Sequence, residues 1–257
     1  MPDLAAPPTT SPSPYRGRFA PSPTGPLHVG SLAAALASWL FARRAGGAWL
    51  LRIEDIDPPR EQPGAAALQI RTLAAFGMTP DEPVLWQSRR IDAYRDALDR
   101  LVESGQVFEC HCSRRTQAAV PGVHRSCVPG AQRADPAIRF RVPNRTTLAF
   151  TDMVQGRFEQ RVDDAVGDFV IRRADGLISY QLAVVVDDQY QGITEVIRGA
   201  DLLDSTPRQI LLQRALGYPT PGYGHIPLLL DAEGRKLSKS LAAVPVTADD
   251  PIPALRV

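Results

Sequence analysis

Short apolar runs that alternate with amphipathic stretches are the feature that most constrains how this chain can fold. An apolar run at residues 18–20 precedes a proline-rich loop, and residues 29–40 then repeat apolar side chains at helical spacing. Residues 48–53 have the pattern of a buried strand, and helical patterns follow at about residues 63–76 and 89–104. Strands and helices that alternate in this way predict a parallel β-sheet.

The pattern changes at about residue 108. A cluster of cysteines is followed by strand-like alternation at residues 137–142 and 157–162, and then by a hairpin turn at residues 175–176, Asp-Gly. Antiparallel strands at this position predict an insertion that separates two α/β halves.

The second α/β half is predicted to resume after this insertion. The apolar run at residues 182–186 predicts a buried strand, and residues 193–198 predict another. Residues 205–207, Ser-Thr-Pro, are typical of the start of a helix, which should end at Gly217. The last predicted strand covers residues 225–230.

Composition narrows the class of protein. With 257 residues, 44% of them hydrophobic, the chain can bury one sizeable core, alone or with a smaller attached unit. Lys and Arg number 29 against 28 for Asp and Glu, so an RNA partner would need a local basic patch. No apolar run approaches the length of a membrane span, and three cysteines cannot all pair, so we expect a cytoplasmic protein without a membrane partner. Residues 1–15 are rich in proline and predict a disordered tail.

The loop after the first predicted strand carries the first candidate functional residues. Backbone N–H groups at a helix start favour anions, and Gly30 would let a nucleotide approach closely. His28 could donate a hydrogen bond to charge that builds on a phosphate oxygen. A proline-rich loop with one satisfied histidine is the alternative interpretation.

A second candidate segment, Lys-Leu-Ser-Lys-Ser at residues 236–240, follows the last predicted strand and a glycine-containing turn. Two lysines that flank a serine on a mobile loop can close over a triphosphate and neutralise charge on its bridging oxygens. A solvated basic loop is the alternative interpretation of this segment.

Together, His-Val-Gly-Ser at residues 28–31 and the segment at 236–240 resemble the paired signatures of class I aminoacyl-tRNA synthetases. RFAPSPTGPLHVGS, RIEDIDPPR and DDQYQGITEVIRGADLLDSTPRQ stand in the order found in glutamyl-tRNA synthetases, and the resemblance covers about residues 16–240. It implies chemistry with ATP and Mg²⁺. The residues implied for catalysis are His28, Lys236 and Lys239, and those implied for ATP binding are His28, Gly30, Ser31, Lys236, Ser238 and Lys239.

The resemblance also implies the α/β domain organisation. In this family a Rossmann-type parallel sheet is split by an insertion that meets the acceptor end of tRNA. The implied units are a disordered tail at 1–15, a first Rossmann half at 16–107, an insertion with a zinc knuckle at 108–178, a second Rossmann half with the KLSKS loop at 179–245 and a short C-terminal tail at 246–257. No anticodon-binding domain is expected, because only seventeen residues follow Ser240.

Glutamate recognition follows from charge and from the same resemblance. Guanidinium groups are the best receptors for a carboxylate, and a carboxylate is the best receptor for an ammonium group. By resemblance, Arg18 and Arg198 face the substrate carboxylates. Glu54 takes the α-ammonium group, and Tyr180 adds a hydroxyl group. The wall of the same pocket is implied to contain Phe19, Ala20, Pro21 and Ser22.

The pocket has an alternative interpretation and one departure from the family. The two arginines are otherwise members of surface ion pairs, and Glu54 is otherwise a partner of Arg52 or Arg60. Glutamyl-tRNA synthetases usually carry an Asn in the segment that corresponds to YQLAVVVDD, where this chain has Val184. The missing amide implies a pocket like that of the short relatives, which activate glutamate without prior binding of tRNA.

Cys110, Cys112 and Cys127, with two histidines nearby, have the spacing of a metal knuckle. Zinc takes four soft or borderline ligands in a tetrahedron, and its binding can fold an insertion too small to make its own core. His124 is the natural fourth ligand, although relatives often carry Tyr there, and His111 is the alternative. We expect one structural zinc ion per chain, and three reduced thiols are the other interpretation.

The short relatives that keep the catalytic body and the zinc knuckle but lack the anticodon-binding region are the glutamyl-queuosine tRNA(Asp) synthetases. The resemblance therefore implies ATP-dependent activation of L-glutamate without tRNA, and transfer of glutamate to queuosine in the anticodon of tRNA(Asp). A monomer is expected. The alternatives are a truncated glutamyl-tRNA synthetase that charges the 3′ end, a non-catalytic paralogue that binds tRNA or an amino acid, and a different nucleotidyl transferase.

Overall fold

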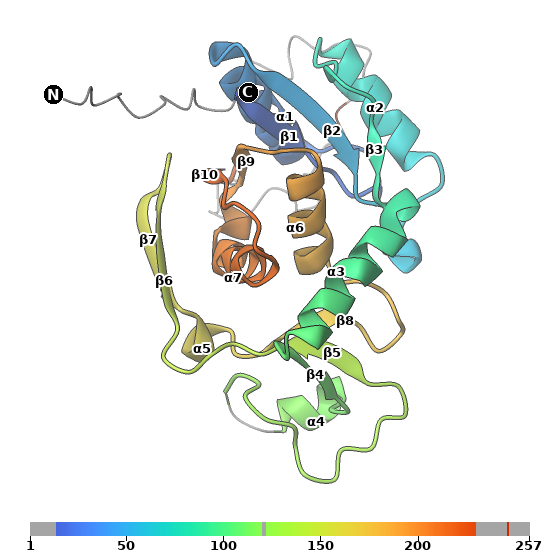
Figure 1. Ribbon diagram of the computed structural model, residues 1–257. Coiled ribbons are helices and arrows are strands. Elements are labelled where there is room, and N and C mark those ends of the chain that lie inside the picture. The colour runs from blue at the N-terminus through green and yellow to red at the C-terminus, as the bar shows by residue number, and fades with distance from the viewer. Residues whose placement is uncertain (1–13, 120–121, 230–245, 247–257) are drawn as a thin grey trace, which may run out of the picture.

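Parallel strands from the first and the last third of the chain lie side by side in the upper part of Figure 1. The structure is a computed structural model that describes residues 14–119, 122–229 and 246. In these ranges β1 (Arg16–Phe19), β2 (Ala48–Ile53) and β3 (Leu85–Trp86) pair in parallel in that order, and β9 (Glu195–Gly199) pairs in parallel with β10 (Gly222–Ile226). Thr194 N–H donates to the Arg16 carbonyl at 2.9 Å, which places β9 beside β1. The strands therefore form one parallel layer with a seam between β1 and β9.

Helices cover this layer and bury its apolar side chains. They are α1 (Val29–Arg44), α2 (Ala65–Ala75), α3 (Ile91–Glu103), α6 (Tyr180–Tyr190) and α7 (Thr206–Leu216), with 3₁₀ turns at Pro58–Arg60, Gln87–Arg90 and Ala200–Ser205. One apolar core joins α1 and α2 to β1 and β2 through Leu32, Trp49 and Leu73, and a second joins α3, α6 and α7. None of the helices in the described ranges combines the length and apolar character that a membrane span requires.

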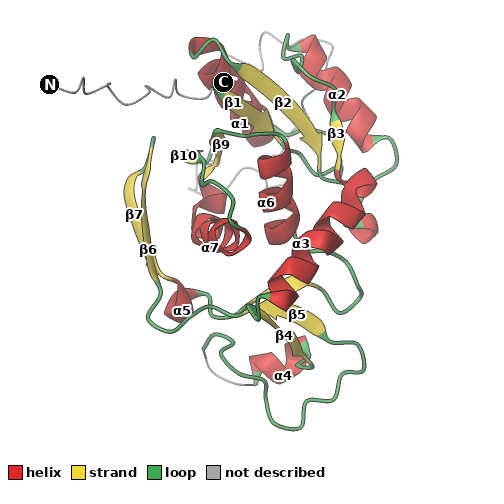
Figure 2. Cartoon of the chain, in the orientation of Figure 1, coloured by secondary structure: helices red, strands yellow, loops and turns green. Residues whose placement is uncertain are grey.

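The region from β4 to β8, here called the inserted segment, is antiparallel. Its elements are β4 (Val107–Cys110), α4 (Arg114–Ala118), β5 (Ala137–Phe140), β6 (Thr147–Asp152), β7 (Gly156–Arg161), α5 (Val162–Ala165) and β8 (Phe169–Arg172). β4, β5 and β8 form one small sheet, and β6 and β7 form a separate hairpin. Loops make up much of the end that carries α4 (Figure 2). Met153 N–H donates to the Tyr223 carbonyl at 2.8 Å, so the tip of the hairpin docks on β10.

Several predicted elements are confirmed. The strands at 48–53 and near 193–198, the helices near 29–40, 63–76 and 89–104, and the strands at 137–142 and 157–162 have counterparts in the structure. The helix that starts at residues 205–207 ends at Gly217, whose φ of 70° is the left-handed conformation that glycine tolerates best. The predicted turn at residues 175–176 closes with Arg173 N–H on the Leu177 carbonyl, and its arms are joined by a bridge between Arg172 and Ile178.

Two predictions of secondary structure are wrong. Residues 182–186 lie in α6, all of them buried, rather than in a strand. A continuous apolar run fits a helix buried on several sides as well as a buried strand, so periodicity could not separate the two. The last strand spans Gly222–Ile226 and ends before Pro227, which cannot donate to a strand ladder, so the prediction at 225–230 lies too far along the chain.

Three further predictions fall on parts of the chain that the structure does not describe, one of them the C-terminal tail at 246–257, of which only residue 246 is described. The disordered tail predicted at 1–15 lies outside the described residues except for residues 14 and 15. The KLSKS segment at 236–240 lies entirely outside them.

Candidate functional site

Two adjoining clefts lie at the carboxyl ends of the parallel strands, where ligands bind in open α/β sheets. The first, of about 300 Å³, lies between β1, β9 and the start of α1. The predicted residues that line it are Arg18, Phe19, Ala20, Pro21, Ser22, His28, Gly30, Ser31, Tyr180 and Arg198. The second, of about 500 Å³, is lined by Glu54 and shares Ala20, Ser22 and Tyr180 with the first. The structure thus brings together every predicted glutamate- and ATP-site residue that it describes.

The start of α1 forms one wall of the first cleft. His28 is the N-cap residue of α1, and its Nδ1 accepts a hydrogen bond from Ser31 N–H at 3.2 Å. The neutral ring therefore carries its proton on Nε2, which lies 2.9 Å from Ser31 Oγ. A Cβ atom at Gly30 would stand 3.1 Å from the imidazole ring, so this position favours glycine. The helix start thus presents N–H groups and an imidazole donor to the cleft.

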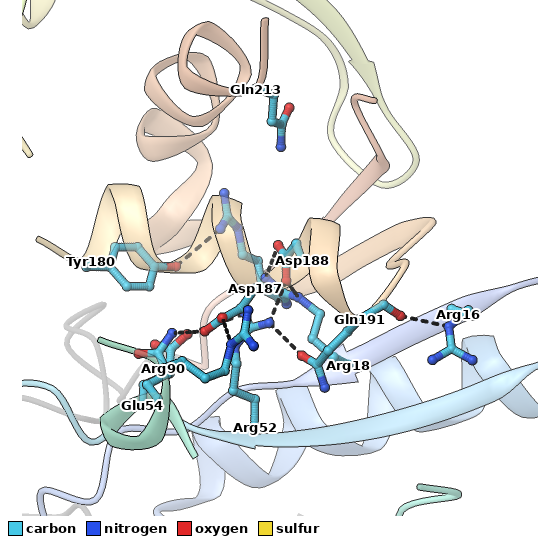
Figure 3. Close-up of polar contacts among 12 residues, drawn as sticks. Arg16, Arg18, Arg52, Glu54, Arg90, Tyr180, Asp187, Asp188, Gln191 and Gln213 are labelled. Carbon is cyan, nitrogen blue, oxygen red and sulfur yellow. Dashed lines mark hydrogen bonds and ion pairs between the residues drawn. The ribbon is translucent and has the colours of Figure 1, made fainter. Parts of the chain in front are cut away.

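Arg18 is buried in an ion-pair network rather than in a surface pair (Figure 3). Its exposed fraction is 3%, and its Nε and Nη2 reach the two carboxylate oxygens of Asp188 at 3.0 and 3.3 Å. Arg52 Nη1 lies 2.8 Å from the same carboxylate. Burial alone would raise the pKa of Asp188, but the two guanidinium groups outweigh it and hold the pKa below its ordinary value. Arg18 is therefore held in place before any ligand arrives.

Arg198 is equally buried, with an exposed fraction of 5%, but the partners that the structure gives it are neutral. Its Nε lies 3.0 Å from His225 Nε2, its Nη2 donates to Thr206 Oγ1 at 2.8 Å, and its Nη1 donates to Tyr180 Oη at 3.3 Å. Within the described ranges no carboxylate forms an ion pair with this guanidinium group. A buried cation of this kind, at the wall of a cleft, is a receptor for an anion.

Glu54 lines the second cleft with an unfilled acceptor. Its Oε1 is buried without a hydrogen-bond partner, and Arg52 Nη2 lies 3.5 Å away. The ion pair between Glu54 and Arg52, which was the alternative interpretation of Glu54, is thus present but long. Burial, as the largest cause, raises the pKa of Glu54 to about 7 against the opposing effect of Arg52 and Arg18. A cationic ligand group beside Oε1 would favour the ionised form.

Sequence reasoning missed the acids that organise this site. Asp187 and Asp188 end the buried apolar face of α6, and both are buried. Asp187 accepts hydrogen bonds from Gln87, Arg90 and Tyr94 at 2.8, 2.6 and 2.7 Å. The available signal was their position directly after the apolar run at 182–186, since acids there must be buried and therefore paired.

The cysteine cluster lies apart from the clefts, in the inserted segment. One ligand atom from each of Cys110, Cys112, His124 and Cys127 lies within 4.8 Å of the others. A tetrahedral zinc ion with Zn–S bonds of about 2.3 Å needs ligand atoms about 3.7 Å apart, so the four residues fit the ion after small adjustments. His111 instead lies with Nδ1 2.7 Å from the Arg133 carbonyl oxygen.

The protonation of His124 also suits a metal ligand. Burial, followed by the nearby charge of Arg139, lowers the pKa of His124, which favours the neutral imidazole that can ligate a metal. Its Nε2 lies 3.4 Å from Cys110 Sγ. The four residues that the sequence predicts as ligands are thus gathered in the described structure.

Comparison with known proteins places this chain in a family. The family described as tRNA synthetases class I (E and Q), catalytic domain, matches residues 15–118 and 128–250. A protein of Xanthomonas campestris named glutamyl-Q tRNA(Asp) synthetase is 63% identical over 245 residues, covering 95% of this chain and 82% of that protein. A protein of the same name from Burkholderia cenocepacia is 56% identical over 257 residues, covering 94% of this chain and 86% of that protein.

Solved structures agree at the level of the fold. A glutamate tRNA ligase from Elizabethkingia meningosepticum, in complex with its amino acid, superposes with a TM-score of 0.79 at 28% identity over 87% of this chain. The glutamate-tRNA synthetase from Elizabethkingia anophelis gives a TM-score of 0.79 at 30% identity over 88% of this chain. This chain spans about half of each solved chain, 51% and 52% respectively.

The structure and the comparisons support the same assignment. The clefts lie at the carboxyl ends of the parallel strands, and the family and its relatives match most of the chain. The chain belongs to the class I glutamyl- and glutaminyl-tRNA synthetase catalytic-domain family, as a ligase-type enzyme of the glutamyl-Q tRNA(Asp) synthetase group.

Proposed function

We propose that the two clefts bind L-glutamate and ATP, that the chain forms glutamyl-adenylate without tRNA, and that it then transfers glutamate to queuosine in the anticodon of tRNA(Asp). The observation that carries the proposal is a buried cation without an anionic partner on one cleft wall and a buried carboxylate oxygen without a hydrogen bond on the adjoining wall. Arg198 has neutral partners only, and Glu54 has a buried oxygen without a partner. An amino acid with a carboxylate and an ammonium group complements both.

Each substrate group then has a named receptor. Arg198 receives a carboxylate with Tyr180 beside it, and Arg18, already oriented by Asp188, faces the same cleft. Glu54 receives the α-ammonium group across the second cleft. Phe19, Ala20, Pro21 and Ser22 form the wall between these charges.

ATP is placed at the start of α1, and the family uses it with Mg²⁺. His28, Gly30 and Ser31 line the cleft where N–H groups favour phosphate oxygens. An α-carboxylate oxygen of glutamate attacks the α-phosphorus atom, and the bond to pyrophosphate breaks. Lys236, Ser238 and Lys239 are assigned to the leaving pyrophosphate by resemblance, and they lie outside the described residues.

Activation without tRNA is supported by the organisation of the pocket. Val184 is fully buried in the apolar core and lines neither cleft, so this position offers the clefts no amide that tRNA binding would have to reorient. Arg18 is held by Asp188 in the structure of the chain alone. A pocket whose charged walls are fixed in advance needs no RNA to assemble it.

Zinc is assigned to Cys110, Cys112, His124 and Cys127 as one structural ion per chain. When bound, the ion cross-links the loops around α4 without an open coordination position. The insertion that the sequence predicts at residues 108–178 then offers a stable surface to RNA. We place this protein, as a monomer, in the cytoplasm.

The acceptor is assigned from the chemistry of the adenylate and from the relatives. A mixed anhydride reacts with any well-placed hydroxyl group, so positioning selects the acceptor. Queuosine carries a cis-diol, and one of its hydroxyl groups attacks the activated carbonyl carbon as AMP leaves. Relatives that match most of this chain are named glutamyl-Q tRNA(Asp) synthetase, which favours this acceptor over the 3′ end.

The test uses labelled glutamate in two assays. Glutamate-dependent exchange of pyrophosphate into ATP should proceed equally with and without tRNA. Label should then pass to tRNA(Asp) that contains queuosine and hardly at all to the same tRNA with guanine at that position. After nuclease digestion the label should stay with the anticodon fragment and be released by mild base. Label on the 3′-terminal adenosine would refute the assigned acceptor, and exchange that requires tRNA would refute independent activation.

A further inference from the structure

The β6–β7 hairpin reaches the first cleft through a line of buried polar groups. Asp152, at the end of β6, is 2% exposed, and His225, in β10, is fully buried. His225 Nδ1 lies 2.5 Å from Asp152 Oδ2, and His225 Nε2 lies 3.0 Å from Arg198 Nε. An aspartate of the inserted segment therefore contacts a cleft arginine through one imidazole ring.

The hydrogen-bond network fixes where the proton of His225 lies. The N–H groups of Val154, Gln155 and His225 donate to Asp152 Oδ1 at 3.0, 2.9 and 3.0 Å. Burial alone would raise the pKa of Asp152, but these donors and the imidazole outweigh it and keep the carboxylate ionised. A carboxylate only accepts, so Nδ1 carries the ring proton and Nε2 accepts from Arg198.

The ring also stays neutral. Burial, followed by the charge of Arg198, lowers the pKa of His225 against the opposing effect of Asp152. A neutral ring with its proton on Nδ1 is the form that can accept a hydrogen bond from a guanidinium group at Nε2.

We propose that Asp152 and His225 are positioning residues that orient the guanidinium group of Arg198 in the cleft and so couple the β6–β7 hairpin to glutamate recognition. Thr206 and the Leu202 carbonyl hold Nη2, and Tyr180 contacts Nη1. The bond from Nε to His225 fixes the remaining edge and with it the plane of the group. The inference rests on the proposed function, in which Arg198 receives a substrate carboxylate, because such recognition depends on that plane.

The ring is not needed merely to dock the hairpin. Gln155 Nε2 donates to the His225 carbonyl at 2.7 Å, and Met153 N–H donates to the Tyr223 carbonyl at 2.8 Å. Both bonds join the hairpin to β10 without contact to the imidazole. Gln155→Ala is therefore the matched control, since it weakens docking and leaves the line from Asp152 to Arg198 intact.

Asp152→Asn reverses the direction of one hydrogen bond with little change of shape. The amide oxygen can keep the three backbone bonds at Oδ1, while the NH₂ group replaces Oδ2 and donates to His225 Nδ1. The ring proton then moves to Nε2, which can no longer accept from Arg198. We expect the KM for glutamate to rise on the order of 10- to 100-fold, as for a lost hydrogen bond to a charged group, with the KM for ATP unchanged.

Two substitutions of His225 separate its two contacts. His225→Asn keeps an amide near the Nδ1 position and loses the acceptor for Arg198, whereas His225→Gln places an amide oxygen near the Nε2 position. The Asn variant should match Asp152→Asn in its KM for glutamate. The Gln variant should stay within about fivefold of the wild-type KM, because it keeps the bond to the charged group.

The experiment measures glutamate-dependent pyrophosphate exchange and, independently of activity, the ¹⁵N chemical shifts of the His225 ring. Support requires an Nδ1 proton in the wild type, an Nε2 proton in Asp152→Asn, and the predicted pattern of KM values with Gln155→Ala unchanged. Equal losses in all variants, the control included, would show a structural role and overturn the inference. Active wild-type enzyme with unchanged KM in Asp152→Asn and His225→Asn overturns this inference alone. Absence of exchange in the wild type overturns the proposed function as well.

Discussion

The clefts and the cysteine cluster differ in what stabilises their buried polar side chains. Around the clefts, charged side chains from β1, β2 and α6 neutralise one another, as in the contacts of Arg18 and Arg52 with Asp188. In the inserted segment, four side chains of the types that ligate metals come from one short stretch of chain and lie together. Ion pairs between side chains stabilise the cleft region, whereas the thiol and imidazole groups of the cysteine cluster would all gain a partner only when a cation binds. Loss of a ligand should therefore affect the two regions very differently.

The largest loss of activity is expected on substitution of Arg198, the cleft arginine whose described partners are all neutral. Arg198→Ala should lower kcat/KM for glutamate by about 100- to 1,000-fold, because it removes one partner of the buried charge pair that we propose with the substrate. Arg198→Lys should recover little, since an ammonium group cannot reproduce the planar fork.

Arg100→Ala is the control for Arg198→Ala. Arg100 contacts Tyr218 and the Leu216 carbonyl, away from the residues that line the clefts, so its loss should leave exchange unchanged. Exchange kinetics and thermal melting of the three variants make the comparison. An Arg198→Ala enzyme within tenfold of wild type would remove this residue from the glutamate site.

An intermediate effect is expected from pH. In the proposed site the ionised form of Glu54 receives the substrate ammonium group, and burial raises the pKa of this carboxyl to about 7. Binding therefore weakens as pH falls through 7, with about a tenfold loss of kcat/KM one unit below that pKa. Exchange assays from pH 5.5 to 8.5 measure the profile.

Glu54→Gln tests the assignment of that profile. The variant should be poorly active at every pH, and the titration near 7 should disappear because no carboxyl group remains to ionise. A variant that keeps the wild-type inflection would assign the titration to another group.

The smallest effect on activation is expected from the second region. Cys127→Ser should reduce zinc from about one ion per chain to nearly none while leaving glutamate activation within about threefold, because a structural site holds no reacting atoms. Transfer to tRNA should fall more than activation does. Metal analysis and the two activity assays decide the point, and full zinc occupancy in the variant or loss of activation would contradict the comparison.

The sequence predicted the parts of the fold that local chemistry determines. The start of α7 and its end at Gly217 followed from a Ser-Thr-Pro segment and a glycine with positive φ. The run at 182–186 was misassigned because burial on several sides removes the periodicity that distinguishes a helix from a strand. The ligand spacing of Cys110, Cys112 and Cys127 was readable because all three lie in one short stretch.

The site was predictable only where motifs carried it. Arg18, Glu54 and Arg198 came from resemblance to a family, not from their own spacing, since they lie on or directly after separate strands far apart in the chain. Asp152 and His225 were missed altogether. Their contact joins the inserted segment to β10. The two residues are 73 positions apart in the sequence, so no local pattern predicts that they pair.

The seam between β1 and β9 has a consequence for how the protein is made. Arg16 and Thr194 exchange hydrogen bonds across 178 residues of chain, so the edge of β1 stays open until β9 has been synthesised. At about 5–20 residues per second, that wait is on the order of 10 to 35 s. The pairs of the inserted segment are closer in sequence and can form meanwhile, which makes closure of the central sheet a late event. A ligand that contacts both Arg18 on β1 and Arg198 on β9 would then stabilise the newly closed sheet, because it binds the folded state and so makes reopening and proteolysis rarer.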